Sequence, residues 1–196
     1  MLGFFFLSNS KMRGHSTAMA VAVLLLFSSH MATSNTESWR EILGLQKEKV
    51  SHLHFYFHDV ITGKNPTSIA VAGANTTLTS PTFFGLVNVV DNTLTKGPKP
   101  TSKLIGRGQG FFASSSQSEI SFFMAINFVF MEGKFNGSTL TMVGRNPIMH
   151  KEREMTVVGG SGAFRLARGY AIAKTFVSDL RTKNAIVEYH ITVIHF

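Results

Sequence analysis

The chain has 196 residues, of which 44% are hydrophobic and 15% charged, and this composition is typical of one globular domain. The formal net charge is +8, but the Lys and Arg residues are scattered without a basic run, which argues against a nucleic-acid-binding protein. The sequence has no cysteine, which excludes disulfides, thiolate metal sites and a cysteine nucleophile. The fold must therefore be stabilised by its core, by a closed sheet or by oligomerisation.

The N-terminal segment differs from the rest of the chain. Lys11 and Arg13 precede an apolar run at residues 18–27, and small residues follow it. This order is typical of a secretory signal peptide, and the run is too short to span a bilayer, which needs about 20 residues. We therefore predict a signal peptide at residues 1–32, cleaved near residues 28–34, and a secreted protein with no membrane association after cleavage.

Two further features fit secretion. Asn75 and Asn136 each begin an Asn-X-Ser/Thr sequon, so we predict N-glycosylation at both. Residues 33–50 form a polar N-terminal arm, mobile or folded as one short helix, before the domain at residues 51–196. Met12 is an alternative start, which would leave a more ordinary signal peptide.

From residue 51 onward the chain alternates apolar and polar residues between closely spaced turn signals, which predicts strands. No long segment has the period of a helix. A chain of eight or nine such strands forms a closed barrel or a sandwich. The predicted strands are residues 52–60, 68–74, 83–95, 103–115, 118–131, 138–145, 153–160, 163–177 and 185–196.

The strand at residues 118–131 favours the barrel. Ile120, Phe122, Met124, Ile126, Phe128 and Phe130 share one face, and Phe123, Ala125, Val129 and Met131 share the other. Successive side chains of a strand point to opposite faces, so both faces of this strand are largely apolar. We predict that one face lines a barrel interior and that the other is covered by a second subunit.

Two glycine-rich stretches, residues 106–110 and 159–162, are not predicted to bind nucleotides. A phosphate-binding glycine loop follows a strand and opens a helix, whereas strands follow both of these stretches. We predict that residues 159–162 form a hairpin turn, and that the glycines at 106–110 permit a bend or a close approach within a strand.

The stretch HLHFYFHDV at residues 52–60 presents two different faces. One face carries His52, His54, Tyr56 and His58, and the other carries Leu53, Phe55, Phe57 and Asp59. His52 and His54 could hold a metal ion together with a third ligand such as His58, His190 or a distant carboxylate. An outward polar face explains the same histidines without a metal, so we predict no metal site.

Asp59 continues the aromatic face of this strand. A carboxyl at the end of an apolar cavity has a raised pKa and can exchange a proton at mildly acidic pH. An aspartate at the end of a strand can also cap the turn that follows. The residues alone leave both interpretations open.

Several ordered motifs, covering residues 50–196, resemble those of plant dirigent proteins. They are FYFHDVITGKNPTSIAVA, FGLVNVVDNTLT, GRGQGFFASSS, FVFMEGKFNGSTLTMVGRNPIM and REMTVVGGSGAFRLARGYA. The resemblance implies an all-β fold, an eight-stranded antiparallel β-barrel assembled as a homotrimer and secreted to the apoplast and cell wall. It implies no cofactor and no oxidase activity.

The resemblance also implies two possible functions. The best-known members hold phenoxy radicals, for example from coniferyl alcohol oxidised by a separate laccase or peroxidase, and direct their stereoselective coupling to a lignan. A related branch consists of lyases that dehydrate isoflavan-4-ols to pterocarpans. Both routes pass through a quinone methide. A wall protein with a vestigial cavity is a third hypothesis.

The resemblance assigns roles to individual residues. Asp59 matches a proposed proton donor or acceptor, and Arg153 matches an arginine that would bind a phenolate or carbonyl oxygen. Asn146 stands where lignan-forming members carry Asp, and Phe112 stands where many members carry Tyr. With Phe57, these two residues are predicted to contact the substrate. Because it lacks this second carboxylate, the chain resembles the non-lignan branches of the family.

Structural explanations exist for two of these residues. Arg153, between Glu152 and Glu154, could be a partly solvated strand arginine. Asn146 could be a turn residue before Pro147.

Overall fold

The computed structural model describes residues 47–196, which form one compact unit. The predicted signal peptide, and the predicted arm up to residue 46, lie outside the described residues. The first strand begins at Lys49, within the segment predicted as an arm. Among residues 47–196, no helix has the length and apolar character needed to cross a membrane.

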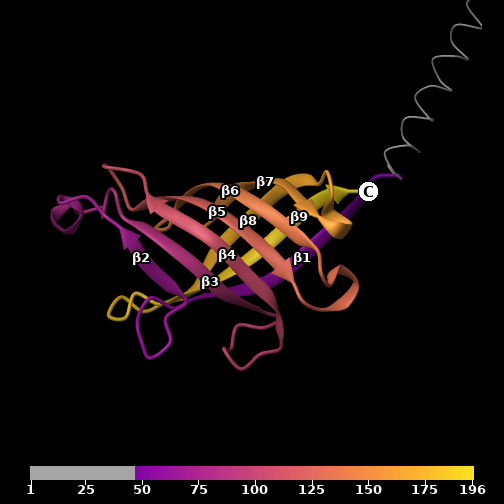
Figure 1. Cartoon of the computed structure of the whole chain (residues 1–196), viewed down its shortest axis with the longest axis horizontal. Coiled ribbons are helices and arrows are strands. Elements are labelled where there is room, and N and C mark those ends of the chain that lie inside the picture. Colours follow the sequence, from indigo (N-terminus) through magenta and orange to yellow (C-terminus); the bar gives the residue numbers. More distant parts are fainter. Residues whose placement is uncertain (1–46) are drawn as a thin grey trace, which may run out of the picture. The chain divides into compact units, whose positions relative to one another are not determined.

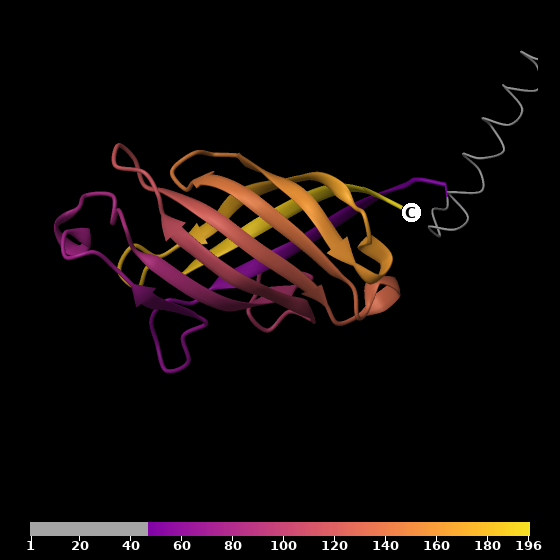
Figure 2. The same ribbon diagram turned by 45° about the horizontal axis from the view of Figure 1, so that its top comes forward.

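The described chain is one antiparallel sheet of nine strands with three short 3-10 turns (Figures 1 and 2). Each predicted strand overlaps one observed strand. The elements are β1 (Lys49–Asp59), β2 (Ser68–Ala72), η1 (Thr77–Thr79), β3 (Val87–Thr95), β4 (Leu104–Ser114), β5 (Ser121–Phe130), η2 (Gly133–Phe135), β6 (Thr139–Pro147), β7 (Arg153–Ser161), η3 (Gly162–Phe164), β8 (Arg168–Ser178) and β9 (Ala185–His195).

Strand β3 closes the sheet. The strands follow the order β1-β9-β8-β7-β6-β5-β4-β3-β2, and β1 also pairs with β3. This second pairing makes a closed barrel of β1 and β3 to β9, which confirms the predicted eight-stranded antiparallel β-barrel. The C-terminal half of β3 pairs with β1, Tyr56 opposite Thr95, and its N-terminal half pairs with β2, Ser68 opposite Val90.

The barrel interior is packed with aromatic and aliphatic side chains. Phe128 of β5 is fully buried, and its ring meets those of Phe55 and Tyr189 edge-on at centroid distances of 5.0 and 5.4 Å. Edge-to-face pairs add to the stabilisation that burial alone supplies. The sequence pattern left open which face of β5 is interior; the structure selects the face that carries Met124, Ile126, Phe128 and Phe130.

One end of the barrel is sealed by aromatic rings. Phe164 of η3 packs against Phe130, Phe135 and His195, with centroid distances of 5.6, 4.6 and 5.2 Å. This is the right-hand end in Figure 1, where η2 and η3 lie.

The opposite end of the barrel is open to solvent. Four interior-facing residues there keep accessible surface, although interior residues at mid-barrel have almost none. The side chains concerned are Asp59, Phe122 and Val187, which are partly exposed, and Thr175, which is exposed. Solvent therefore contacts interior-facing side chains at this end.

The predicted turn at residues 159–162 is displaced. Gly159 and Gly160 belong to β7, and the chain turns through η3, where Gly162 has a φ of +60°. The Ser138 hydroxyl accepts a hydrogen bond from the Ala163 N–H, which holds this turn. The strand predicted from residue 163 therefore begins at Arg168.

The glycines of β4 permit the predicted close approach. Gly108 lies under the Phe57 ring, and a Cβ at this position would lie 2.4 Å from Phe57 Cε2. The absence of a side chain at residue 108 thus lets Phe57 occupy the interior beside Asp59.

Gly108→Ala should lower the free energy of unfolding by about 1–3 kcal/mol, because the Phe57 ring has to leave its position. Urea unfolding measures this change. Gly159→Ala is the matched control, since no atom lies within 4 Å of its added Cβ. Equal stability of the two variants would contradict the close packing of Phe57 on β4.

Candidate functional site

All five residues predicted for catalysis or substrate contact belong to interior faces and lie toward the open end of the barrel. Phe57 and Asp59 end β1, and Arg153 begins β7. Asn146 of β6 lies opposite Phe122, whose ring is 4.7 Å from that of Phe112. The structure thus brings together residues that are up to 96 positions apart in the chain (57 and 153).

Asp59 lies where β1 leaves β3. Its Oδ1 accepts a hydrogen bond from Asn92 Nδ2 at 3.1 Å, and its carboxylate also bonds the Ser68 side chain. The Thr67 hydroxyl donates to Asn92 Oδ1, which turns the Asn92 amide N–H toward Asp59. Asn92, itself oriented by Thr67, and Ser68 therefore fix the position of the Asp59 carboxyl.

Asp59 does not cap the turn that follows β1. The N–H groups of Ile61 and Thr62 donate instead to Asn184 Oδ1, at 2.8 and 3.0 Å. The turn-capping interpretation of Asp59 is therefore not supported by the structure.

Asp59 is the one aspartate of three whose pKa is raised. Burial raises it, and the hydrogen bonds from Asn92 and Ser68 oppose this in part. Arg107 lowers the pKa of Asp91, and hydrogen bonds from the backbone at residues 181 and 182 lower that of Asp179. Asp59 is thus suited to exchange protons closer to neutral pH than an ordinary aspartate.

Arg153 is a buried cation, only 2% exposed. Its Nε donates to Asn146 Oδ1 at 3.0 Å, and one Nη donates to Thr175 Oγ1 at 3.0 Å and to the His150 carbonyl at 3.3 Å. Burial lowers its pKa. The interpretation of Arg153 as a partly solvated strand arginine is therefore wrong.

No carboxylate of residues 47–196 forms a salt bridge with Arg153. An unpaired buried charge is costly to a fold, and such groups cluster at functional sites. Arg153 can therefore stabilise negative charge that develops on a bound oxygen.

Asn146 is a strand residue, not a turn residue. It is 5% exposed within β6, where its amide N–H donates to Met124 Sδ at 2.9 Å and its Oδ1 accepts from Arg153. Asn146 thus orients Arg153 without neutralising its charge.

Sequence reasoning missed Tyr189 of β9. The charges of both Asp59 and Arg153 act on its hydroxyl, and burial raises its pKa, so it remains a neutral phenol. Within residues 47–196, no protein group hydrogen-bonds this hydroxyl. One signal in the sequence could have found Tyr189. It is two residues from both Val187 and Ile191, so all three side chains share one face of the strand.

Two other interior polar residues were also missed. Asn88 Oδ1 and Ser114 Oγ are buried, and neither has a hydrogen-bond partner among the described residues. Asn88 lies opposite Phe112 in the β3–β4 ladder, and its amide nitrogen contacts Ser68 Oγ at 3.4 Å. Buried polar groups of this kind can bind the hydroxyl groups of a ligand.

The histidines of β1 do not share one environment. His52 and His54 are exposed, as predicted for an outward face, but His58 is buried and bonded to Thr95 Oγ1 at 2.7 Å. Asn75 and Asn136 both lie in exposed loops, and their glycosylation stays a prediction.

Comparison with known proteins decides the family. The family model of dirigent-like proteins matches residues 50–194. The chain belongs to the dirigent family. It is 51% identical to dirigent protein 21 of Arabidopsis thaliana over 152 residues, covering 78% of this chain and 80% of the relative.

Pterocarpan synthases are also among the relatives of this dirigent protein. Pterocarpan synthase 1 of Glycyrrhiza echinata is 47% identical over 173 residues, covering 88% of this chain and 92% of the relative. The solved structure of the pterocarpan synthase dirigent protein GePTS1 superposes with a TM-score of 0.75 at 49% identity, covering 79% of this chain and 95% of that one. These relatives confirm the barrel and place the chain near the pterocarpan branch.

Asp59→Asn should change how stability depends on pH. Because the pKa of Asp59 is raised in the folded state, ionisation costs the folded protein stability as pH rises from about 4 through the native pKa. The asparagine variant avoids this cost, so its melting temperature relative to the wild type should rise by a few degrees between pH 4 and pH 7.

Asp91→Asn is the control of opposite sign, because Arg107 lowers the pKa of Asp91 and its ionised form supports the fold. Its melting temperature relative to the wild type should fall slightly over the same pH range. The same trend in both variants would contradict the raised pKa of Asp59.

Asn146→Asp should stabilise the barrel. The contact of 3.0 Å between Arg153 Nε and Oδ1 would become a charge-assisted hydrogen bond and give the buried arginine a counter-charge. We expect the free energy of unfolding to rise by about 1 kcal/mol at pH 7. A loss of stability in urea unfolding would show that Arg153 is not an uncompensated cation.

Proposed function

We propose that this dirigent protein binds phenoxy radicals, made by a separate laccase or peroxidase, and directs their stereoselective coupling. One observation carries the proposal. A proton-exchanging carboxyl, Asp59, and an unpaired buried cation, Arg153, lie toward the same solvent-accessible end of a barrel lined with aromatic rings. The function needs no cofactor of the protein itself, because the separate oxidase removes the electrons.

The aromatic walls would hold the phenol rings of two radicals. Phe57, Phe112 and Phe122 supply flat apolar surfaces at this end, and Tyr189, Asn88 and Ser114 supply polar atoms. A fixed relative orientation of two radicals before the bond forms selects one enantiomer, since free radicals in solution couple from both faces.

Asp59 and Arg153 would act after coupling. Coupling leaves quinone methides, and ring closure by the alcohol hydroxyl requires a proton to move from that hydroxyl to the methide oxygen. Asp59 can accept this proton from the hydroxyl and pass it to the methide oxygen, while Arg153 stabilises negative charge on the phenolic oxygen. The step is an isomerisation, so the electrons balance without a redox group.

A second candidate is a lyase that dehydrates an isoflavan-4-ol to a pterocarpan. It is favoured by Asp59 as an interior carboxyl with Asn146 in place of a second carboxylate, and by the similarity to pterocarpan synthases. Protonated Asp59 would donate to the leaving hydroxyl, water would depart, and the phenol that closes the ring would return its proton to Asp59. No oxidant is consumed.

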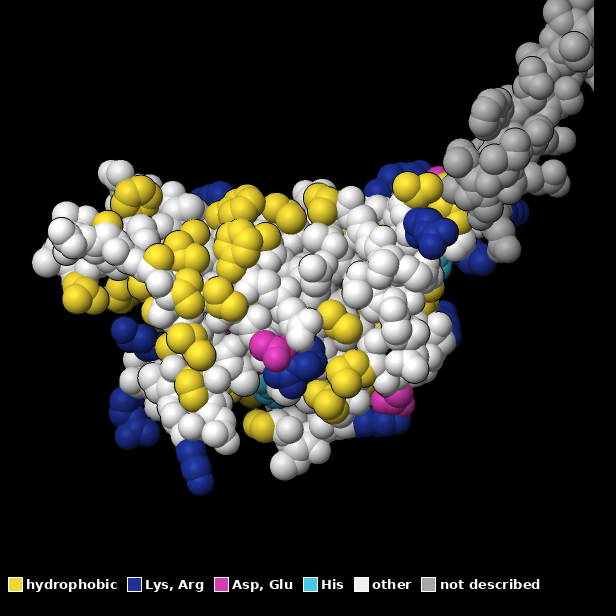
Figure 3. Space-filling model, viewed as in Figure 1, with side chains coloured by type: hydrophobic (Ala, Val, Ile, Leu, Met, Phe, Trp, Pro, Cys, Tyr) yellow, Lys and Arg dark blue, Asp and Glu magenta, His cyan; other side chains and the backbone are white. Residues whose placement is uncertain are grey.

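We also propose that the protein is secreted to the apoplast and assembles as a homotrimer. Figure 3 shows hydrophobic side chains gathered on the face that carries β2, β3, β4 and β5. They include Ile69, Val71, Val89, Phe111 and Phe123, which are 43–58% exposed. Because the outward face of β5 is apolar and no helix among residues 47–196 covers it, second copies of the barrel are its proposed partners.

Chiral product analysis tests the function. The purified protein is incubated with coniferyl alcohol and a limiting one-electron oxidant, and in parallel with an isoflavan-4-ol without oxidant. We expect an enantiomeric excess in the lignan with an unchanged total oxidation rate. Racemic lignan together with loss of water from the isoflavanol would support the lyase, and activity in neither assay would favour a wall protein with a vestigial cavity.

Asp59→Asn should reduce either activity by about 100-fold or more, the usual contribution of a general acid–base group. Its circular dichroism should match the wild type, since the amide preserves the shape of the carboxyl. His52→Gln, on the outer face of the same strand, serves as the matched control. Full activity of the Asp59→Asn variant would exclude a role for Asp59 in proton transfer.

A further inference from the structure

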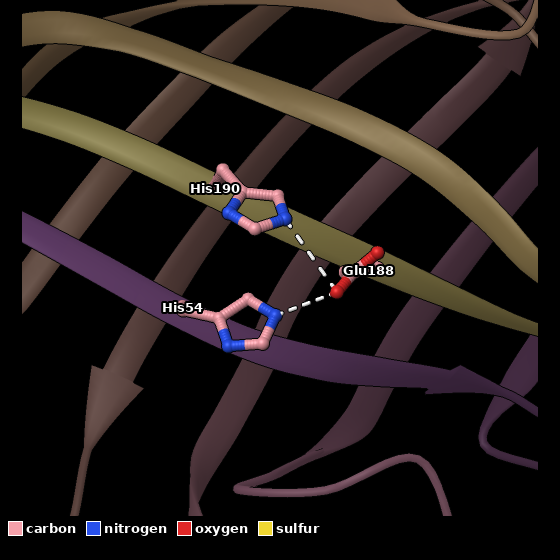
Figure 4. A group of neighbouring side chains, drawn as sticks. All are labelled: His54, Glu188 and His190. Carbon is pink, nitrogen blue, oxygen red and sulfur yellow. Dashed lines mark hydrogen bonds and ion pairs between the residues drawn. The ribbon is translucent and has the colours of Figure 1, made fainter.

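Three side chains on the outer face of the barrel converge on one point. His54 of β1 and His190 of β9 lie directly opposite each other in the ladder, and their rings stack at a centroid distance of 4.5 Å. Glu188 lies two residues before His190 on the same face (Figure 4). Its Oε1 is 2.7 Å from His54 Nε2 and 3.5 Å from His190 Nε2.

The arrangement has the donors and spacing of a metal site. One nitrogen from each ring and one carboxylate oxygen lie within 4.8 Å of one another. Ligand–metal bonds to imidazole and carboxylate measure about 2.0–2.2 Å, so an ion between the three atoms would need only small side-chain movements. The side chains of His54 and His190 are 45% and 51% exposed, which leaves solvent access for a fourth ligand.

A neighbouring residue holds the carboxylate in place. The Tyr56 hydroxyl donates to Glu188 Oε1 at 3.0 Å, and hydrogen bonds of this kind orient metal ligands. Lys174 lies opposite Glu188 on β8, but its ammonium group is bonded to Glu152 at 2.7 Å.

The pair differs from the one considered from sequence spacing. His52 shares the outer face with His54, but its ring lies 3.2 Å from Thr192 Oγ1. The partner of His54 is therefore His190 on the neighbouring strand, far away in the sequence. The carboxylate of Glu188 lies on the same strand as His190.

We propose that His54, Glu188 and His190 form a binding site for a divalent transition-metal ion of the zinc class. Imidazole and carboxylate ligands suit zinc and copper, whereas calcium and magnesium need more oxygen ligands. The ion would link the first and last strands of the barrel, β1 and β9, in a protein that has no cysteine to cross-link them. This site is separate from the interior of the barrel and does not depend on the proposed function.

Isothermal titration of the EDTA-treated, dialysed protein with Zn²⁺ tests the proposal. We expect one site per chain with a Kd of about 10 µM or tighter, and no comparable binding of Ca²⁺. His190→Gln and Glu188→Gln should each weaken Zn²⁺ binding tenfold or more. His52→Gln should bind like the wild type, because its ring does not reach Glu188.

Thermal unfolding gives an independent readout. Zn²⁺ at a hundredfold excess over Kd should raise the melting temperature of the wild type by about 5–10 °C, and EDTA should reverse the rise. Melting temperatures without Zn²⁺ verify that the variants fold, and His54→Gln replaces any variant that does not. Failure of Zn²⁺ to bind, or unchanged binding after loss of either His54 or His190, would overturn the proposal.

Discussion

The pairing of β1 with β3 is the constraint on which the rest of the structure depends. It closes the sheet, and it occupies only the C-terminal half of β3, so the chain has to leave the ladder at Asp59 and rejoin it as β2. This junction places Asp59 beside Asn92 and Ser68, inside the barrel wall and not on its surface. Closure also creates the apolar interior that raises the pKa of the carboxyl.

The two ends of the barrel serve different purposes. Rings of Phe130, Phe135 and Phe164 fill the sealed end. At the open end the fold tolerates features that cost stability, namely a buried unpaired Arg153 and the unbonded polar atoms of Asn88 and Ser114. Local violations of good packing and polar satisfaction concentrate at sites of function. Their concentration at one end supports ligand binding there.

Features that depend on the alternation of side chains within one strand could be predicted from the sequence. The two-sided pattern of β5 predicted the barrel, and the phase of Leu53, Phe55 and Phe57 placed Asp59 inside. Features that depend on the register between strands could not be predicted from the sequence. The burial of Arg153 between two glutamates follows from its ladder with Ala173, and Tyr189 approaches Asp59 and Arg153 only after closure. The turn after β7 was misplaced because insertion of Phe164 into the core decides it.

The most direct measurement is a ¹³C NMR titration of the Asp59 carboxyl carbon, with and without a phenolic ligand. The chain has only three aspartates, so the Asp59→Asn variant assigns the signal. The structure predicts that Asp59 titrates above the ordinary aspartate value while Asp91 and Asp179 titrate below it, and that a bound phenol shifts only the Asp59 signal. The role of Asp59 as the proton carrier of an enclosed site would be contradicted by two results together: its carboxyl titrates like the other two, and its ¹³C signal does not change when the ligand is added.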